Sequence, residues 1–297
     1  MKRLAVAALL LVAACGSVNT VQAHTISLAY KAGDTYKYAL HFVLKYTVGV
    51  QSMSIPLDLD LSGKETAKVN SVDSTGVADA TITVSDLSAK TTVNGTTNTT
   101  TTASTTVEVK VGPDGRVISV NGNAMGTSGS LPGMSGTDSG LVSAILPDKP
   151  VKPGDTWTKS YDETGLAGST GTLHVTSDNK YVRDEKVSNV NAAVVESKIN
   201  ANLDLTLDMS KLGGGGTPLF PSSGAGTGGL QGMTMKGTST SDVTSWIDSG
   251  ARHIVKSHST GSVDATLEFQ MAAGQTMPGL TGPITFKGTQ TLDMNPA

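Results

Sequence analysis

The sequence contains a single cysteine, Cys15, among its 297 residues. One thiol cannot form an intramolecular disulfide, so the fold has to be stabilised without such cross-links. Aromatic residues are also scarce, at 4%, whereas glycine is abundant, with 34 residues. Glycine favours turns, and the many threonines favour strands over helices. The composition therefore predicts a protein built from strands and turns.

Positive charge is scarce as well. The chain has a formal net charge of -3 and no dense run of lysine or arginine. If Lys2 and Arg3 are removed with an N-terminal signal, the charge becomes -5, since -3 minus 2 is -5. Nucleic-acid binding requires a basic patch that neutralises phosphates. Nucleic acid is therefore not an expected partner.

The motifs that carry common enzyme chemistry are missing from the sequence. There is neither a GxSxG nor an HExxH motif, and the glycine runs do not precede helices as they do in phosphate-binding loops. Asp58 and Asp60 alternate with leucines, which predicts ordinary exposed carboxylates. We expect no catalytic residues, metal site or cofactor. The five histidines are His24, His41, His174, His253 and His258. We expect His253 and His258, which lie five residues apart, to occupy solvent-facing positions.

The N-terminus has the pattern of an export signal. Two basic residues precede an apolar run of about nine residues, from Leu4 to Val12, which is too short to cross a bilayer as a helix. No later stretch is long and apolar enough to do so. We interpret residues 1–14 as a signal peptide and exclude them from the fold.

The segment "VAAC" at residues 12–15 resembles the lipobox of bacterial lipoproteins. The resemblance implies that Cys15 is acylated and becomes the first mature residue, with residues 15–23 as a tether. Several acyl chains on one cysteine anchor a protein far more firmly than one chain does. Gly16 follows the cysteine in place of an aspartate that favours inner-membrane retention. The expected location is therefore the cell envelope, with the protein exported and lipid-anchored in the outer membrane or at the cell surface.

An alternative is cleavage at a second site by the signal peptidase that processes non-lipidated proteins. The tripeptide "VQA" at residues 21–23 fits its preference for small residues, and cleavage there would make His24 the mature N-terminus. An N-terminal histidine can bind copper through its amine and imidazole, with Met233, Met235 and Met277 as soft ligands. Copper binding through His24 is thus a minor alternative, tied to this cleavage site.

Alternation of apolar and polar residues predicts long strands. In "SIPLDLDLSG", Ile55 and three leucines share one face. The segment 193–209 alternates over seventeen residues, roughly 56 Å in extended form, so we expect it to bend or to contain a bulge. The candidate ligand-binding residues of these two apolar faces are Leu57, Leu59, Leu61, Leu203, Leu205, Leu207 and Met209.

An internal repeat indicates the organisation of the chain. "KAGDTY" at 31–36 returns as "KPGDTW" at 152–157. We interpret 24–121 and 151–297 as two β halves, joined by a Gly/Ser-rich and then Pro-rich linker at 122–150. The second half carries a Gly-rich insertion at 212–232. The fold class is all-β, with long antiparallel strands in an internally duplicated curved sheet or half-barrel. Whether the halves form one sheet or two domains is open.

These features resemble duplicated β-domains of bacterial envelopes and, in architecture alone, the lipid-carrying lipoproteins of the LolA and LppX types. The resemblance implies a secreted, membrane-anchored and non-catalytic lipoprotein that binds a lipid or another apolar ligand. No diagnostic motif of the lipid carriers is present, and the duplication differs from a single-copy cup. The alternative is a structural or adhesive envelope module, for which the Thr-rich stretch 96–106 would provide a polar surface.

Overall fold

The structure is a computed structural model that describes residues 23–102, 104–120, 123–124, 145–164, 169–208, 230–271 and 282–297. These residues form strands and turns, without a helix in the described part of the chain. Accordingly, the described residues contain no helix that is long and apolar enough to span a membrane. The strands are β1 (Thr35–Val50), β2 (Met53–Val72), β3 (Ala78–Val93), β4 (Thr96–Thr102), β5 (Thr105–Val111), β6 (Val117–Val120), β7 (Asn123–Ala124), β8 (Thr156–Thr164), β9 (Ser169–Val187), β10 (Val190–Asp208), β11 (Leu230–Asp248), β12 (Ile254–Met271) and β13 (Ile284–Pro296).

All thirteen strands belong to one antiparallel sheet in the order β7-β6-β5-β3-β2-β1-β13-β12-β11-β10-β9-β8, with β4 paired to β3 beside this path. The two halves of the chain meet where β1 pairs with β13, in a register that runs from Tyr38 opposite Pro296 to Val50 opposite Ile284. The all-β prediction with long antiparallel strands is confirmed, and the halves share one sheet.

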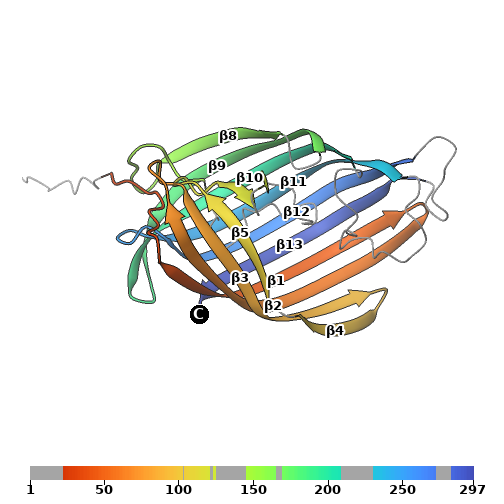
Figure 1. Cartoon of the computed structure of the whole chain (residues 1–297), viewed down its shortest axis with the longest axis horizontal. Helices are drawn as coiled ribbons and strands as arrows, with labels where there is room; N and C mark the ends of the chain where they lie inside the picture. The colour runs from red at the N-terminus through yellow and green to blue at the C-terminus, as the bar shows by residue number, and fades with distance from the viewer. Residues whose placement is uncertain are drawn as a thin grey trace, which may run out of the picture.

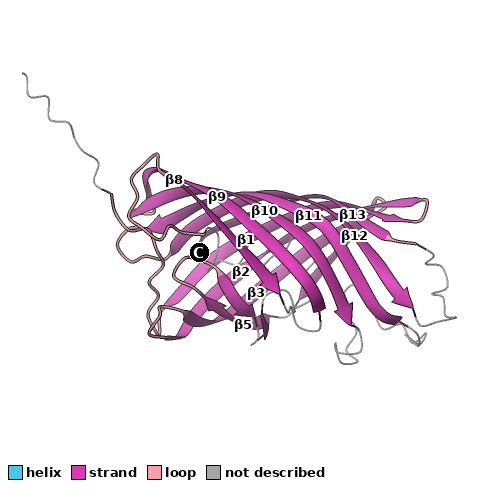
Figure 2. Cartoon of the chain, turned by 90° about the horizontal axis from the view of Figure 1, so that it is seen from above, coloured by secondary structure: helices cyan, strands magenta, loops and turns pink. Residues whose placement is uncertain are grey.

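The sheet is strongly curled and is not closed, since β7 and β8 form its two edges. In Figure 1, β3 and β5 pass in front of β9 to β12, and in Figure 2, seen from above, β8 to β13 lie over β1, β2 and β3. The curl gives the sheet an inner face, which carries Leu44 and its cross-strand neighbours, and an outer face. Strand β1 shows the difference, because Leu44 is buried and its neighbour Lys45 is exposed.

The long pairing of β9 with β10 contains one irregularity. Val194 lies opposite Arg183 and Val195 opposite Tyr181, so the extra residue, Val182, belongs to β9. The alternation of burial on β10 breaks at the same place, where the four residues from Ala192 to Val195 are all buried. A bulge of this kind bends a strand and increases its local twist, which lets β9 follow the curl of the sheet.

The two copies of the repeated turn make matching contacts. Gly33, with φ of 92°, donates its backbone N–H to the carbonyl of Val69 on β2 at 2.9 Å. Gly154, with φ of 96°, donates to the carbonyl of Tyr181 on β9 at 2.7 Å. A positive φ is costly for residues with a Cβ atom, which explains glycine at both positions. Each turn thus joins the start of one long strand to the end of the next.

One end of the curled sheet is filled by chain segments that are not strands. We call this the near end; it contains the turns that connect β2 to β3, β9 to β10 and β11 to β12. Segment 23–34 is held there by the bond from the backbone N of Leu28 to the carbonyl of Pro113, at 2.9 Å. Segment 145–151 is held by Leu146, whose N–H donates to the carbonyl of Asp114 at 2.6 Å. The largest core cluster, with Ile26, Leu28, Tyr181 and Val195, packs around these segments.

Candidate functional site

The candidate site is the inner face of the sheet beyond the near end. The pairing registers align its side chains in rows across neighbouring strands, because antiparallel partners directly opposite one another share a face. One such row crosses from β2 to β8. It consists of Leu57, Tyr46, Gly288, Val263, Ser239, Ala201, Val175 and Tyr161.

The first group of predicted ligand-binding residues lies on β2. Leu57, Leu59 and Leu61 are half-buried and pack against a cluster on β1 and β12. Their partners directly opposite on β1 are aromatic or aliphatic, so β1 and β2 present apolar side chains to the inner face here. The buried members of the cluster are Phe42, Leu44, Tyr46, Val263 and Ala265.

The second group lies on β10. Leu205 is buried and Leu203 half-buried, in a cluster that spans β8 to β11. Leu207 pairs with Met233, but its side chain lies outside the described residues, as does the whole of Met209. The buried members of this cluster are Leu173, Val175, Ile199, Ala201, Leu205 and Val243.

Four strands separate the two groups, since β1, β13, β12 and β11 lie between β2 and β10. A third cluster bridges this gap, with Leu267, Ile284 and Phe286 buried. Met235 packs against both the second and the third cluster. The predicted leucines therefore do not form one compact cluster of their own but mark the two sides of a broad apolar face.

On β2 and β11 the inner face is more deeply buried toward the near end. On β2, the inner-facing residues from Ile55 to Leu61 are half-buried, whereas Glu65, Ala67 and Val69 are buried. On β11, the inner-facing residues change from half-buried at positions 233–241 to buried at positions 243–247. The half of the inner face at the opposite end, which we call the far half, is therefore half-buried on β2 and β11, whereas Leu267, Ile284 and Phe286 keep it buried on β12 and β13.

The histidines of the outer face form ion pairs with aspartates on adjacent strands. His41 lies 3.1 Å from Asp60, His174 2.5 Å from Asp162 and His258 2.7 Å from Asp293. Each is a pair of one histidine and one carboxylate. Among the described residues, no group of three or more histidine, cysteine, aspartate and glutamate side chains is placed to hold a metal ion.

His24 contacts two other segments of the chain at the near end. Its backbone N donates to the carbonyl of Val151 at 2.9 Å, and Val151 N donates back at 3.0 Å. Its ring packs edge-on against Tyr181, whose hydroxyl lies 3.0 Å from Nε2. Copper chelation through the His24 amine would therefore have to break the pairing with Val151.

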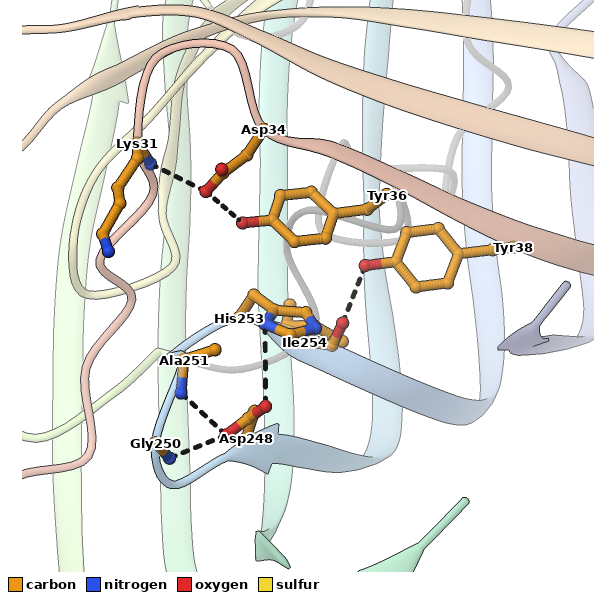
Figure 3. A network of polar contacts seen from close by, with 9 residues as sticks. All are labelled: Lys31, Asp34, Tyr36, Tyr38, Asp248, Gly250, Ala251, His253 and Ile254. Atoms are coloured by element: carbon orange, nitrogen blue, oxygen red, sulfur yellow. Dashed lines mark hydrogen bonds and ion pairs between the residues drawn. The ribbon is translucent and has the colours of Figure 1, made fainter. Parts of the chain in front are cut away.

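The turn between β11 and β12 packs against the start of β1 through a polar network (Figure 3). The ring of His253 stacks on Tyr36 with 4.6 Å between centroids, and its Nδ1 lies 4.0 Å from the Asp248 carboxylate. The Tyr36 hydroxyl donates to Asp34 at 2.9 Å. The Tyr38 hydroxyl donates to the carbonyl of Ile254 at 2.7 Å, and burial, followed by the charge of Glu65, raises the pKa of Tyr38.

This network predicts a loss of stability in mild acid. Burial lowers the pKa of His253 below its ordinary value of 6.5, although Asp248 and Asp34 act in the opposite direction. Below about pH 6.5 the unfolded chain therefore takes up a proton more readily than the folded chain. We expect the free energy of unfolding to fall as the pH drops, by at most about 1.4 kcal/mol for each pH unit from this group.

Urea denaturation at pH 7.5 and at about pH 5.5 measures the effect. The variant His253→Gln should lose less stability over this interval than the wild type. Thr47→Gln, at an exposed position on the outer face of β1, is the control and should behave as the wild type. Equal losses in His253→Gln and the wild type would contradict the assignment.

Part of the inner face was not singled out in the sequence. Leu40, Phe42, Leu44 and Tyr46 recur at every second position in "LHFVLKYT", with Val43 as the one apolar residue between them, and this period-two signal could have indicated their shared face. Phe286 and Ile284 on β13 follow the same pattern. What the sequence could not supply was the register that places these strands between the two predicted leucine groups.

Comparison with known proteins does not assign the chain to a family. No protein-family model matches the sequence, and no curated protein matches it. Among solved structures, the chain is similar to DynF from the dynemicin biosynthesis pathway of Micromonospora chersina, with 7% sequence identity over 92% of this chain and 85% of that chain. The TM-score of 0.24 is too low for this similarity to bear on function.

Proposed function

We propose that the protein is an exported, lipid-anchored and non-catalytic envelope protein whose inner sheet face binds a lipid or another apolar ligand. Acylated Cys15 provides the anchor and the curled sheet provides the binding surface. One observation supports the binding part most directly. Three apolar clusters adjoin one another across the inner face, and apolar side chains that pack against them, among them Leu57, Leu59 and Met235, are only half-buried.

The energetic reason is the cost of exposing apolar surface to water. Each Å² of apolar surface that a ligand removes from water is worth about 25 cal/mol. The half-buried apolar side chains whose surface a ligand would remove from water come from β1, β2, β11 and β12. They are Val48, Val50, Leu57, Leu59, Leu61, Met233, Met235 and Phe269.

Native mass spectrometry of the full chain carrying Cys15→Ser tests the proposal, because this substitution removes the attachment point of the acyl chains. The protein is purified from a bacterial host without detergent. We expect an additional mass of several hundred daltons, as an order of magnitude for one drug-sized or lipid-sized ligand, that disappears on denaturation. Incubation with envelope lipids should restore it.

Two variants at Leu59 locate the ligand. Leu59→Asp places a charge on the half-buried apolar face, and Leu59→Trp fills it with a larger apolar side chain. Both should abolish the additional mass, since charge burial is costly and the indole occupies the ligand's place. Thr47→Asp adds the same charge on the exposed outer face of β1 and should retain it. Circular dichroism confirms that each variant is folded.

A structural or adhesive module is the second candidate, and strand β4 is the observation that favours it. Residues 96–101 of this strand expose their side chains, almost all of which are threonine, and β4 pairs with β3 alone in the described sheet. Thr92 and Thr97 join the two strands through their hydroxyls at 2.9 Å. A bare protein mass that persists after incubation with lipids would contradict ligand binding and favour this candidate.

A further inference from the structure

The inner face carries a band of polar residues next to its apolar clusters. It lies on β9 to β13, between the near-end core and the far half. A sheet face that served only as a packed core would be expected to be apolar there. The buried polar residues of this band are Ser177, Asn179, Ser197, Ser245, Ser257, Ser259 and Gln290.

Ser197 differs from its neighbours in this band. Its side chain is 3% exposed, yet its Oγ has no hydrogen-bond partner among the described residues. The residue directly opposite on β9 is Asn179, which is already engaged. Its Nδ2 donates to the carbonyl of Ser177 at 3.0 Å, and its Oδ1 accepts from the Ser177 hydroxyl at 2.7 Å.

A buried hydroxyl without a partner destabilises a fold, and a ligand that supplies an acceptor would remove that penalty. Ser197 is well placed for such a contact. It shares the inner face of β10 with Ile199, Ala201, Leu203 and Leu205, a row in which Leu203 is half-buried and the others are buried. A ligand chain that inserts along this row from Leu203 toward the near end would meet the Ser197 hydroxyl beyond Ile199.

The length of this row suits an acyl chain. Leu205 lies eight positions after Ser197, and a strand that rises about 3.3 Å per residue covers roughly 26 Å over these eight steps. The acyl chains of one lipid leaflet occupy about half of the 30 Å hydrocarbon core of a bilayer, roughly 15 Å. One extended acyl chain thus fits along this part of β10.

We propose that the ligand is an amphiphile with an acyl ester, amide or carboxylate group, whose oxygen accepts a hydrogen bond from Ser197 Oγ while its chain lies along Ile199, Ala201, Leu203 and Leu205. This inference rests on the proposed function and narrows its ligand class. A pure hydrocarbon would cover the same apolar row but would leave the hydroxyl without an acceptor.

Two probes of equal chain length, methyl dodecanoate and tetradecane, separate the two ligand classes. Their binding to the full chain carrying Cys15→Ser is measured by displacement of the fluorescent apolar dye N-phenyl-1-naphthylamine. One hydrogen bond changes affinity by about threefold to tenfold. We expect the wild-type site to bind the ester more tightly than the alkane by this factor.

Ser197→Ala should remove the preference for the ester and leave alkane affinity unchanged. It should also leave the protein folded, since it deletes a hydroxyl that has no partner in the unliganded fold. Ser197→Cys, which keeps the shape but donates only weakly, should give the same result. Ser160→Ala, at an exposed position on β8, is the matched control and should retain the preference.

The results separate a failure of the Ser197 contact from a failure of apolar ligand binding itself. If both probes bind equally to the wild type, or if Ser197→Ala keeps the full preference for the ester, the contact with Ser197 is refuted and apolar binding stands. If neither probe displaces the dye, the proposed binding function itself is refuted.

Discussion

Gly288→Ala is expected to destabilise the protein severely. Gly288 lies on β13 between β1 and β12, opposite Tyr46 and Val263. A Cβ atom there would lie 2.1 Å from the carbonyl oxygen of Lys45 and 2.2 Å from Cδ1 of the Tyr46 ring. Because the first of these atoms belongs to the backbone, β1 and β13 would have to move apart along the seam of the two halves. We expect a loss of about 3 kcal/mol or more.

The control for this substitution is Gly282→Ala. Gly282 precedes β13, is exposed, and a Cβ atom added there would meet nothing within 4 Å. Its free energy of unfolding in urea should stay within about 0.5 kcal/mol of the wild type. A loss in Gly288→Ala no larger than that of the control would show that the β1 and β13 backbones are further apart than described.

Leu44→Ala is expected to produce the second-largest loss of stability. Leu44 is 0% exposed and packs among Phe42, Tyr46 and Val263 at the centre of the inner face. Removing its isobutyl group deletes buried apolar contacts and leaves a cavity that the sheet can only partly close, which costs about 2–5 kcal/mol. Thermal or urea unfolding measures the difference.

Two neighbouring substitutions calibrate this result. Leu59→Ala, directly opposite on β2 but half-buried, should lose clearly less, about 1 kcal/mol, because less of its surface is removed from water. Lys45→Ala, on the exposed outer face, should stay within about 0.5 kcal/mol. Equal losses at Leu44 and Leu59 would contradict the gradient of burial across the inner face.

The strands could be predicted from the sequence because the alternation of side chains is a local property. The faces of Ile55 to Leu61 and of Ala193 to Leu205 lie where the pattern placed them. The register shift at Val194 and Val195 comes from the extra residue Val182 on β9, which the length of segment 193–209 did not indicate. The turn at Gly115, with φ of 87°, likewise follows from local turn chemistry.

The pairing of the strands could not be predicted, because register depends on contacts distant in sequence. Nothing near β1 indicates that β13 lies beside it. The polar band on the inner face was missed for the same reason, since Ser197 stood out in its own segment only as a single exception to an apolar pattern. Its neighbours Asn179 and Ser259 come from other strands and join it only in the folded sheet.

The seam between β1 and β13 also determines when the sheet can be completed. Strand β1 begins at Thr35, and the strand that covers its second edge consists of thirteen residues at the other end of the chain. Contacts between such distant segments form slowly, because a long loop must close before they form. During synthesis, β1 therefore keeps one edge unpaired until the last strand has emerged. The sheet is completed only after the whole chain has been delivered, so truncation at the C-terminus would leave the first half with an open edge prone to aggregation.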